Sequence, residues 1–476
     1  MSFRLALPEM RTVPVTACLI LFASLCADSQ TEKLSVPPAP GQIADVVCAS
    51  DATQTYTLFL PLRYSEAKRW PIIYLFDPGG RGRRPVELYK DVAEQYGFIL
   101  AGSNNSRNFS NDPSKAVNAI WQDTHGRLAL DEHRSYASGF SGGARVAGAM
   151  ALSSPSEMAG VIAHGAGYPS SRSGSKDQLP YFVAVGVEDF NWPEVMNLRH
   201  EREEQGLQYR VRMFRGRHQW APAVVMEEAL QYMNLKAMQA GHLDPDPGFI
   251  DRTFERIKAE AEDAEARKDP IAQLNAYHAL VSDFSGLRDV KESAAKLMAL
   301  RSSSALKAAL KTEREQMSEQ LRLEQEIAPR IDAFTDNSVQ DSTSLRLEIR
   351  EQMGALGDQA KHSKNEVKRL ICTRAFSGIF VRAMEDGQQA LEGRHFEKAE
   401  AYFELMRQVS DDAWPALALA DTHAAAGNRK LAIKDLQEAV RRGLKDRAVF
   451  ESDPRLQGLK EDPEFQKLLA GLEESK

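Results

Sequence analysis

Residues 139–143 read Gly-Phe-Ser-Gly-Gly, and this motif is the strongest local signal in the sequence. It follows a run that favours a β-strand, Ser135–Ser138, and precedes an Ala-rich segment that favours a helix from about Ala144. A Gly-x-Ser-x-Gly motif between a strand and a helix predicts a sharp turn that exposes the hydroxyl of Ser141. The flanking glycines suit such a turn because they have no Cβ atoms to clash there.

The sequence around this motif, from residue 43 to about residue 240, alternates short apolar runs with amphipathic segments. Several runs are apolar at every position, as expected of strands that helices cover on both faces. The predicted strands are Tyr56–Pro61, Ile72–Phe76, Phe98–Ala101, Ser135–Ser138, Gly160–Ala163, Tyr181–Val185 and Tyr209–Phe214. Helices are predicted between them, over Val86–Tyr96, Ala144–Leu152 and Glu194–Gln205. The alternation predicts an α/β fold with a doubly wound, mostly parallel sheet.

Beyond about residue 240 the strand-like runs disappear, and the sequence predicts an all-α region. Four segments have helical periodicity: Phe254–Lys268, Ile271–Phe284, Asp289–Leu310 and Glu313–Ile327. Near the end, Gly393 and Ala399 are echoed by Gly427 and Ala432, and this spacing resembles the tetratricopeptide repeat. We expect a helical region over 241–375 and tetratricopeptide-like repeats with a terminal cap over 376–476. A generic helical bundle is the alternative.

The first residues differ from the rest of the chain. Two arginines flank the start of an apolar run, Val13–Leu25, and Ala27 offers a small residue for cleavage. The run is shorter than the ~20 residues that span a bilayer. We therefore expect a signal peptide over 1–27, a linker over 28–42 and export to the periplasm or the cell exterior, with no membrane span after cleavage. A membrane anchor is the alternative, and lipid anchoring is not favoured.

Composition limits the classes of function. The 476 residues carry a formal net charge of -7, so the sequence lacks the basic character typical of nucleic-acid binding. Signal cleavage would leave Cys48 and Cys372, which we expect to be buried and unpaired. No Cys/His cluster has the spacing of a zinc site, and we expect neither a metal nor a cofactor.

In its strand–helix context, the motif around Ser141 resembles the nucleophile elbow of the α/β-hydrolase superfamily. The likeness is greatest to its secreted feruloyl-esterase and polyhydroxyalkanoate-depolymerase-like esterases, and it covers roughly residues 43–240. It implies a serine nucleophile that is followed along the chain by an acid and then by a histidine.

The histidine should lie on a loop after the last strand, where it can take the serine proton. His218 lies in such a place, and its Gly-x-His-x-Trp-x-Pro surroundings resemble the histidine loop of these esterases. His125 and His133 precede the elbow, His200 falls in a predicted helix, and His164 fits a pocket wall better than a base.

The acid should follow the penultimate strand, where Glu188 and Asp189 compete. Asp189 has the family's Gly-x-x-Asp spacing from Gly186, and its short side chain suits a turn that orients the imidazole. Asp189 is therefore the predicted acid, and Glu188 is the alternative.

The developing oxyanion needs N–H donors. The resemblance assigns one to the backbone of Gly142, the residue after the nucleophile. The second should come from the loop after the strand Ile72–Phe76. The family often has His-Gly-Gly there, whereas this chain has Asp77-Pro78-Gly79-Gly80, so the second donor is open between Gly80 and Arg81.

Other side chains near these motifs have two interpretations each. Six arginines could attract an acidic substrate or be solvated at the surface: Arg81, Arg83, Arg84, Arg145, Arg215 and Arg217. Trp192 and Trp220 could stack on an aryl or sugar group or pack in the core.

The sequence as a whole predicts an exported serine hydrolase that cleaves a small-molecule or polymer-derived ester. Two alternatives stay open. One is a serine peptidase with the same three residues. The other is a non-catalytic hydrolase-fold scaffold whose helical repeats bind a protein partner.

Overall fold

The computed structural model describes residues 36–109, 112–167, 179–336 and 342–472. Within these ranges the chain forms two compact units, one of residues 36–329 and 352–379 and one of residues 330–351 and 380–472. This division differs from the domain boundaries expected at residues 240 and 375, because helices after residue 240 belong to the unit that contains the sheet. The expected signal peptide, over 1–27, lies outside the described residues.

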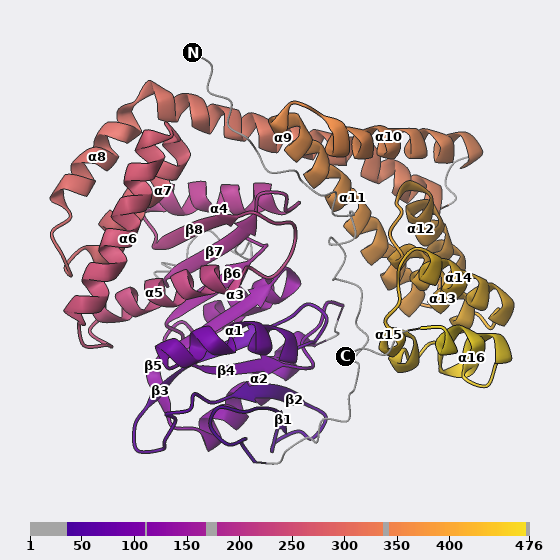
Figure 1. Ribbon diagram of the computed structural model, residues 1–476, viewed down its shortest axis with the longest axis horizontal. Coiled ribbons are helices and arrows are strands. Elements are labelled where there is room, and N and C mark those ends of the chain that lie inside the picture. The colour runs from indigo at the N-terminus through magenta and orange to yellow at the C-terminus, as the bar shows by residue number, and fades with distance from the viewer. Residues whose placement is uncertain (1–35, 110–111, 168–178, 337–341, 473–476) are drawn as a thin grey trace. The chain divides into compact units, whose positions relative to one another are not determined.

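The larger unit is built on an eight-stranded sheet with the order β1-β2-β4-β3-β5-β6-β7-β8 (Figure 1). Its strands are β1 (Ile43–Val47), β2 (Thr55–Phe59), β3 (Trp70–Phe76), β4 (Ile99–Ser103), β5 (Leu130–Phe140), β6 (Gly160–His164), β7 (Tyr181–Gly186) and β8 (Tyr209–Phe214). β1 pairs antiparallel with β2, and β2 pairs antiparallel with β4. Every other pairing, from β4 through to β8, is parallel. The predicted α/β fold with a mostly parallel sheet is confirmed. The strand β1 was not predicted, because it is a half-buried edge strand whose apolar run Asp45 interrupts.

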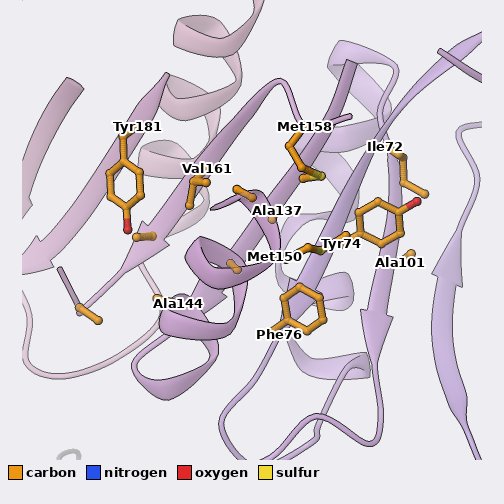
Figure 2. Close-up of a cluster of buried hydrophobic side chains, with 14 of the residues drawn as sticks. Ile72, Tyr74, Phe76, Ala101, Ala137, Ala144, Met150, Met158, Val161 and Tyr181 are labelled. Carbon is orange, nitrogen blue, oxygen red and sulfur yellow. The ribbon is translucent and has the colours of Figure 1, made fainter. Parts of the chain in front are cut away.

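Helices cover both faces of this sheet, since the central strands are apolar on both sides. On one face, the β3 residues Tyr74 and Phe76 pack in a cluster with α2 (Pro113–Arg127), α3 (Gly142–Ser153) and α4 (Trp192–Gln205). On the other face, Ile73 and Leu75 pack with α1 (Arg83–Tyr96) and α5 (Ala223–Gln239). Figure 2 shows part of the first cluster, with Ala144 and Met150 of α3 among the side chains of the strands.

Further helices follow the sheet: α6 (Pro247–Ala266), α7 (Pro270–Phe284), α8 (Lys291–Ser302), α9 (Ser304–Thr335), α10 (Ser342–His362) and α11 (Glu366–Glu392). The helix predicted over 289–310 is in fact two helices. Ser303 has an extended backbone between them, and its hydroxyl accepts a hydrogen bond from the N–H of Leu306 at 3.1 Å. Met317 of α9 belongs to the hydrophobic cluster under α4, so this helix shares the core of the sheet.

The smaller unit contains α12 (Phe396–Val409), α13 (Trp414–Ala425), α14 (Arg429–Arg441), α15 (Arg447–Ser452) and α16 (Pro463–Ala470). Ala399, Ala432 and Ala439 are fully buried in it. A Cβ atom on Gly387 of α11 would lie 2.6 Å from the ring of Phe403, so α11 and α12 approach closely at this glycine. The likeness to tetratricopeptide repeats stays a prediction.

Two further observations concern the described ranges only. Cys48 and Cys372 are buried and form no disulfide there, as expected. None of the helices in these ranges has the length and apolar character needed to span a bilayer.

Candidate active site

Ser141 occupies the turn between β5, which ends at Phe140, and α3, which begins at Gly142. Its backbone has φ 54 and ψ -120, a conformation that is strained for a residue with a side chain. Its N–H donates to the carbonyl oxygen of His164 at 2.9 Å and so ties the turn to β6. The Gly-x-Ser-x-Gly motif therefore forms a strained strand-to-helix turn.

Asp189 and His218 come together on neighbouring loops. Asp189 follows β7 and His218 follows β8, and these strands pair in parallel, so their carboxyl ends meet at one edge of the sheet. His218 Nδ1 lies 2.8 Å from Asp189 Oδ1, and both side chains are fully buried. The N–H of Asn191 donates to the same carboxylate oxygen at 2.8 Å and fixes its orientation.

Aromatic rings hold the imidazole of His218. The ring centroids of Phe140 and Phe190 lie 4.5 Å and 4.2 Å from it, so one ring comes from the residue before Ser141 and the other from the residue after Asp189. A Cβ atom on Gly165, at the end of β6, would lie 2.8 Å from Asp189 Oδ2 and 3.2 Å from His218 Nδ1. The elbow, the acid loop and the histidine loop therefore meet at one place.

The second ring nitrogen of His218 is available for chemistry. Nε2 is buried and has no hydrogen-bond partner among the described residues, so it is not bonded to the Ser141 hydroxyl in this conformation. When Nδ1–H donates to Asp189, Nε2 carries the lone pair that can accept a proton.

Glu188, the competing carboxylate, has other partners. It accepts from Arg217 Nε at 3.2 Å and from Arg369 Nη1 at 2.9 Å. The structure therefore places Asp189, and not Glu188, against His218.

Asp77 organises the loop after β3, a role that was not predicted from the sequence. Its buried Oδ1 accepts from the Gly79 N–H at 2.9 Å and from Arg81 Nε at 2.8 Å, and its Oδ2 accepts from Trp220 Nε1 at 2.9 Å. Because Trp220 lies two residues after His218, one carboxylate ties this loop to the histidine loop. The available signal was an acidic residue directly after a wholly apolar strand.

The proposed oxyanion donors differ in their surroundings. The Gly80 N–H donates to the Asp77 carbonyl oxygen at 3.0 Å in a turn, which weighs against Gly80 and favours Arg81 of the two candidates. Gly142 is the first residue of α3, and N–H groups of a first helical turn have no acceptor within the helix. A Cβ atom on Gly142 would lie 1.9 Å from Asn108 Oδ1, so any other residue there would have to displace the Asn108 side chain.

His164 is a core residue. It is fully buried between Tyr89 and Trp220, at ring distances of 5.8 Å and 5.0 Å. Burial lowers the pKa of its imidazole to about 3, so the ring is neutral at physiological pH.

Most of the arginines and tryptophans expected near the pocket are engaged within the protein. Four of the arginines pair with carboxylates: Arg81 with Asp77, Arg83 with Asp45, Arg145 with Glu194 and Arg217 with Glu188. Trp192 and Trp220 are buried in the hydrophobic clusters. In the described ranges, no group of three or more His, Cys, Asp or Glu side chains could hold a metal ion.

No protein-family model and no curated protein matches the sequence. Similar solved structures include FphF, a fluorophosphonate-binding serine hydrolase of Staphylococcus aureus, with 14% identity and a TM-score of 0.35 over 41% of this chain and 98% of that one. The ferulic acid esterase AmCE1/Fae1A of Anaeromyces mucronatus has 12% identity and a TM-score of 0.33 over 44% of this chain and 94% of that one. Thermogutta terrifontis esterase 2 has 15% identity and a TM-score of 0.33 over 44% and 98%. At these TM-scores the similarities carry no argument about the site.

Proposed function

We propose that the protein is an exported serine hydrolase that cleaves carboxylic esters through Ser141, His218 and Asp189. The observation that carries the proposal is the buried 2.8 Å contact between His218 Nδ1 and Asp189 Oδ1, on loops that meet beside the strained turn of Ser141. Export rests on the sequence of residues 1–27 alone.

In the proposed reaction, Ser141 Oγ attacks the ester carbonyl carbon while His218 Nε2 takes the hydroxyl proton. Asp189 orients the imidazole and stabilises the imidazolium. The ester C–O bond then breaks as His218 returns the proton to the departing alcohol, which leaves an acyl-enzyme. Water, deprotonated by the same imidazole, attacks this acyl group and releases the acid and the free serine.

Two features of the site fit this sequence of steps. Nε2 of His218 has no hydrogen-bond partner among the described residues, and the contact between a nucleophile and its base often tightens only when substrate binds. The oxyanion of each tetrahedral intermediate would lie between the N–H of Gly142 and the loop after β3, where we assign the second donor to Arg81.

The first test is Ser141→Ala with p-nitrophenyl acetate as the substrate. We expect turnover to be lost, because no other group in the proposed site can form the acyl-enzyme. Ser153→Ala, at the far end of the same helix, is the matched control and should retain wild-type turnover. Wild-type turnover by Ser141→Ala would contradict the proposal. Cleavage of peptidyl amides without cleavage of esters would replace the esterase with a peptidase.

A further inference from the structure

The loop that carries Asp189, Val187–Asn191, contacts helices that follow residue 240. The part of α11 up to residue 379 and the part of α9 up to residue 329 belong to the same compact unit as the sheet, so these contacts lie within one body. They come from three side chains on two helices: Arg369 and Arg374 of α11 and Gln320 of α9.

Arg374 fixes both ends of the loop. Its Nε donates to the carbonyl oxygen of Val187 at 2.8 Å. Its guanidinium lies 3.9 Å from the ring centroid of Trp192, the first residue of α4. The Arg374 side chain thus contacts Val187, which begins the loop, and Trp192, which directly follows it.

Arg369 adds a second contact from α11. Its Nη1 donates to Glu188 Oε1 at 2.9 Å, and Arg217 Nε donates to Glu188 Oε2 at 3.2 Å. Because Arg217 precedes His218, the carboxylate of Glu188 joins α11 to both loops of the proposed site.

The far side of the loop rests on α9. Gln320 Nε2 donates to the carbonyl oxygen of Phe190 at 2.8 Å, and the Phe190 ring contacts His218. A Cβ atom on Gly378 of α11 would lie 3.3 Å from Cβ of Phe190, so the helix approaches the loop closely where it lacks a side chain.

The carboxyl groups of the loop favour the charged form of the buried Arg374. The side chain is buried, and burial lowers the pKa of its guanidinium to about 10, whereas the nearby carboxylates of Asp189 and Glu188 act in the opposite direction. Arg374 is therefore charged at neutral pH, beside a loop that carries two carboxyl side chains. A buried cation is costly unless such groups compensate it.

We propose that Arg374, supported by Arg369, is a positioning residue of the active site, which holds Val187–Asn191 so that Asp189 stays bonded to His218. The helices after residue 240 are thus part of the hydrolase. The effect on turnover rests on the proposed function, but the effect on the bond between Asp189 and His218 does not.

The test uses Arg374→Met in the full chain, which keeps most of the side-chain volume but removes the donor and the charge. We expect kcat for p-nitrophenyl acetate to fall roughly 10²-fold with little change in KM, because Arg374 acts through the loop and does not touch substrate. We also expect the downfield proton NMR signal of His218 Nδ1–H to broaden through exchange with water. Arg374→Lys keeps a positive charge and a hydrogen-bond donor, so it should restore part of kcat and part of the sharp His218 Nδ1–H signal.

The matched control is Arg382→Met on the same helix, since Arg382 pairs with Asp332 and Asp386. It should leave kcat and the downfield signal unchanged. A folded Arg374→Met with wild-type kcat and a wild-type signal would overturn the proposal. If Arg374→Met does not fold, Arg369→Met is tested in its place. A wild-type kcat and a wild-type downfield signal in Arg369→Met would then overturn the proposal.

The outcomes also separate the two proposals. Turnover by Ser141→Ala, together with a broadened signal in Arg374→Met, would refute the catalytic role of Ser141 and leave the positioning role standing. Loss of turnover in Ser141→Ala, with kcat and the downfield signal unchanged in Arg374→Met, would support the catalytic role of Ser141 and refute the positioning role of Arg374.

Discussion

The turn at Ser141 depends on neighbouring residues that lack a side chain. A Cβ atom on Gly143 would lie 1.9 Å from the carbonyl oxygen of Phe76, and one on Gly139 would lie 2.2 Å from the carbonyl oxygen of Gly143. Both contacts are far inside van der Waals distance. These two glycines therefore let α3 approach β3 and β5 closely on either side of the strained Ser141.

We expect Gly143→Ala to lower the free energy of unfolding by about 1–3 kcal/mol, because the methyl group forces α3 away from β3. Gly126→Ala in α2 is the control, since a Cβ atom there would meet nothing within 4 Å. Alanine is the better helix former by up to about 1 kcal/mol, so this variant should be neutral or more stable. Urea unfolding measures both. Equal stabilities for the two variants would contradict the packing described for the turn.

Ser141, Asp189 and His218 could be selected from the sequence because each follows a recognisable strand within a short motif. The residues that hold these three in place could not be selected in this way. Arg374 lies 187 positions from the carbonyl group it holds, and an arginine in an amphipathic helix gives no sign of such a contact. Asp77 was visible as an acidic residue directly after an apolar strand and as a departure from the family's His-Gly-Gly, but neither feature showed which groups it bonds.

At the scale of elements, apolar runs predicted the buried strands well, because β3, β6 and β7 have no solvent-facing side to break the pattern. The pattern failed where burial is partial, as in β1, and where a side chain ends a helix, as at Ser303. Helix periodicity also did not reveal that α9 and α11 pack on the unit that contains the sheet, since either partner would use the same apolar stripe.

The contact between α13 and the segment after α15 predicts a pH-dependent stability. Burial, together with the neighbouring carboxyl of Asp453, raises the pKa of Asp421 well above its ordinary value. The folded state therefore keeps a proton that the unfolded chain releases near pH 3.9. This contribution to stability is complete below that pH and is lost as the pH rises through the folded-state pKa.

We expect Asp421→Asn to flatten this dependence, because the amide keeps the volume without a charge to bury. The thermal unfolding midpoint of the full chain, measured at increasing pH, should fall less steeply for the variant than for the wild type. Asp411→Asn, at an exposed position, is the control and should follow the wild type. Parallel curves for the wild type and Asp421→Asn would refute the raised pKa.

At the scale of the whole molecule, the unit that contains the sheet does not end with α5. The buried Arg199 of α4 forms its ion pair with Glu313 of α9, and the buried Arg210 of β8 pairs with Asp283 of α7 at 2.9 Å. Removal of either carboxylate would leave an uncompensated buried charge, which typically costs about 3–5 kcal/mol.

A chain shortened to residues 28–240 should therefore be unstable, since it loses both carboxylates and the contacts that hold the acid loop. We expect poor soluble yield and at least a tenfold lower specific activity on p-nitrophenyl acetate than for residues 28–476. A soluble fragment with the unfolding midpoint and activity of the longer chain would show that the helices are a separable addition.

Mapping the site of covalent modification would show whether Ser141 is the nucleophile that His218 and Asp189 activate. The full chain would be treated with a fluorophosphonate probe and digested, and the modified residue would be located by mass spectrometry. We predict a single adduct on Ser141 that is absent from His218→Ala. An adduct on another residue, or undiminished labelling of His218→Ala, would contradict this role of Ser141.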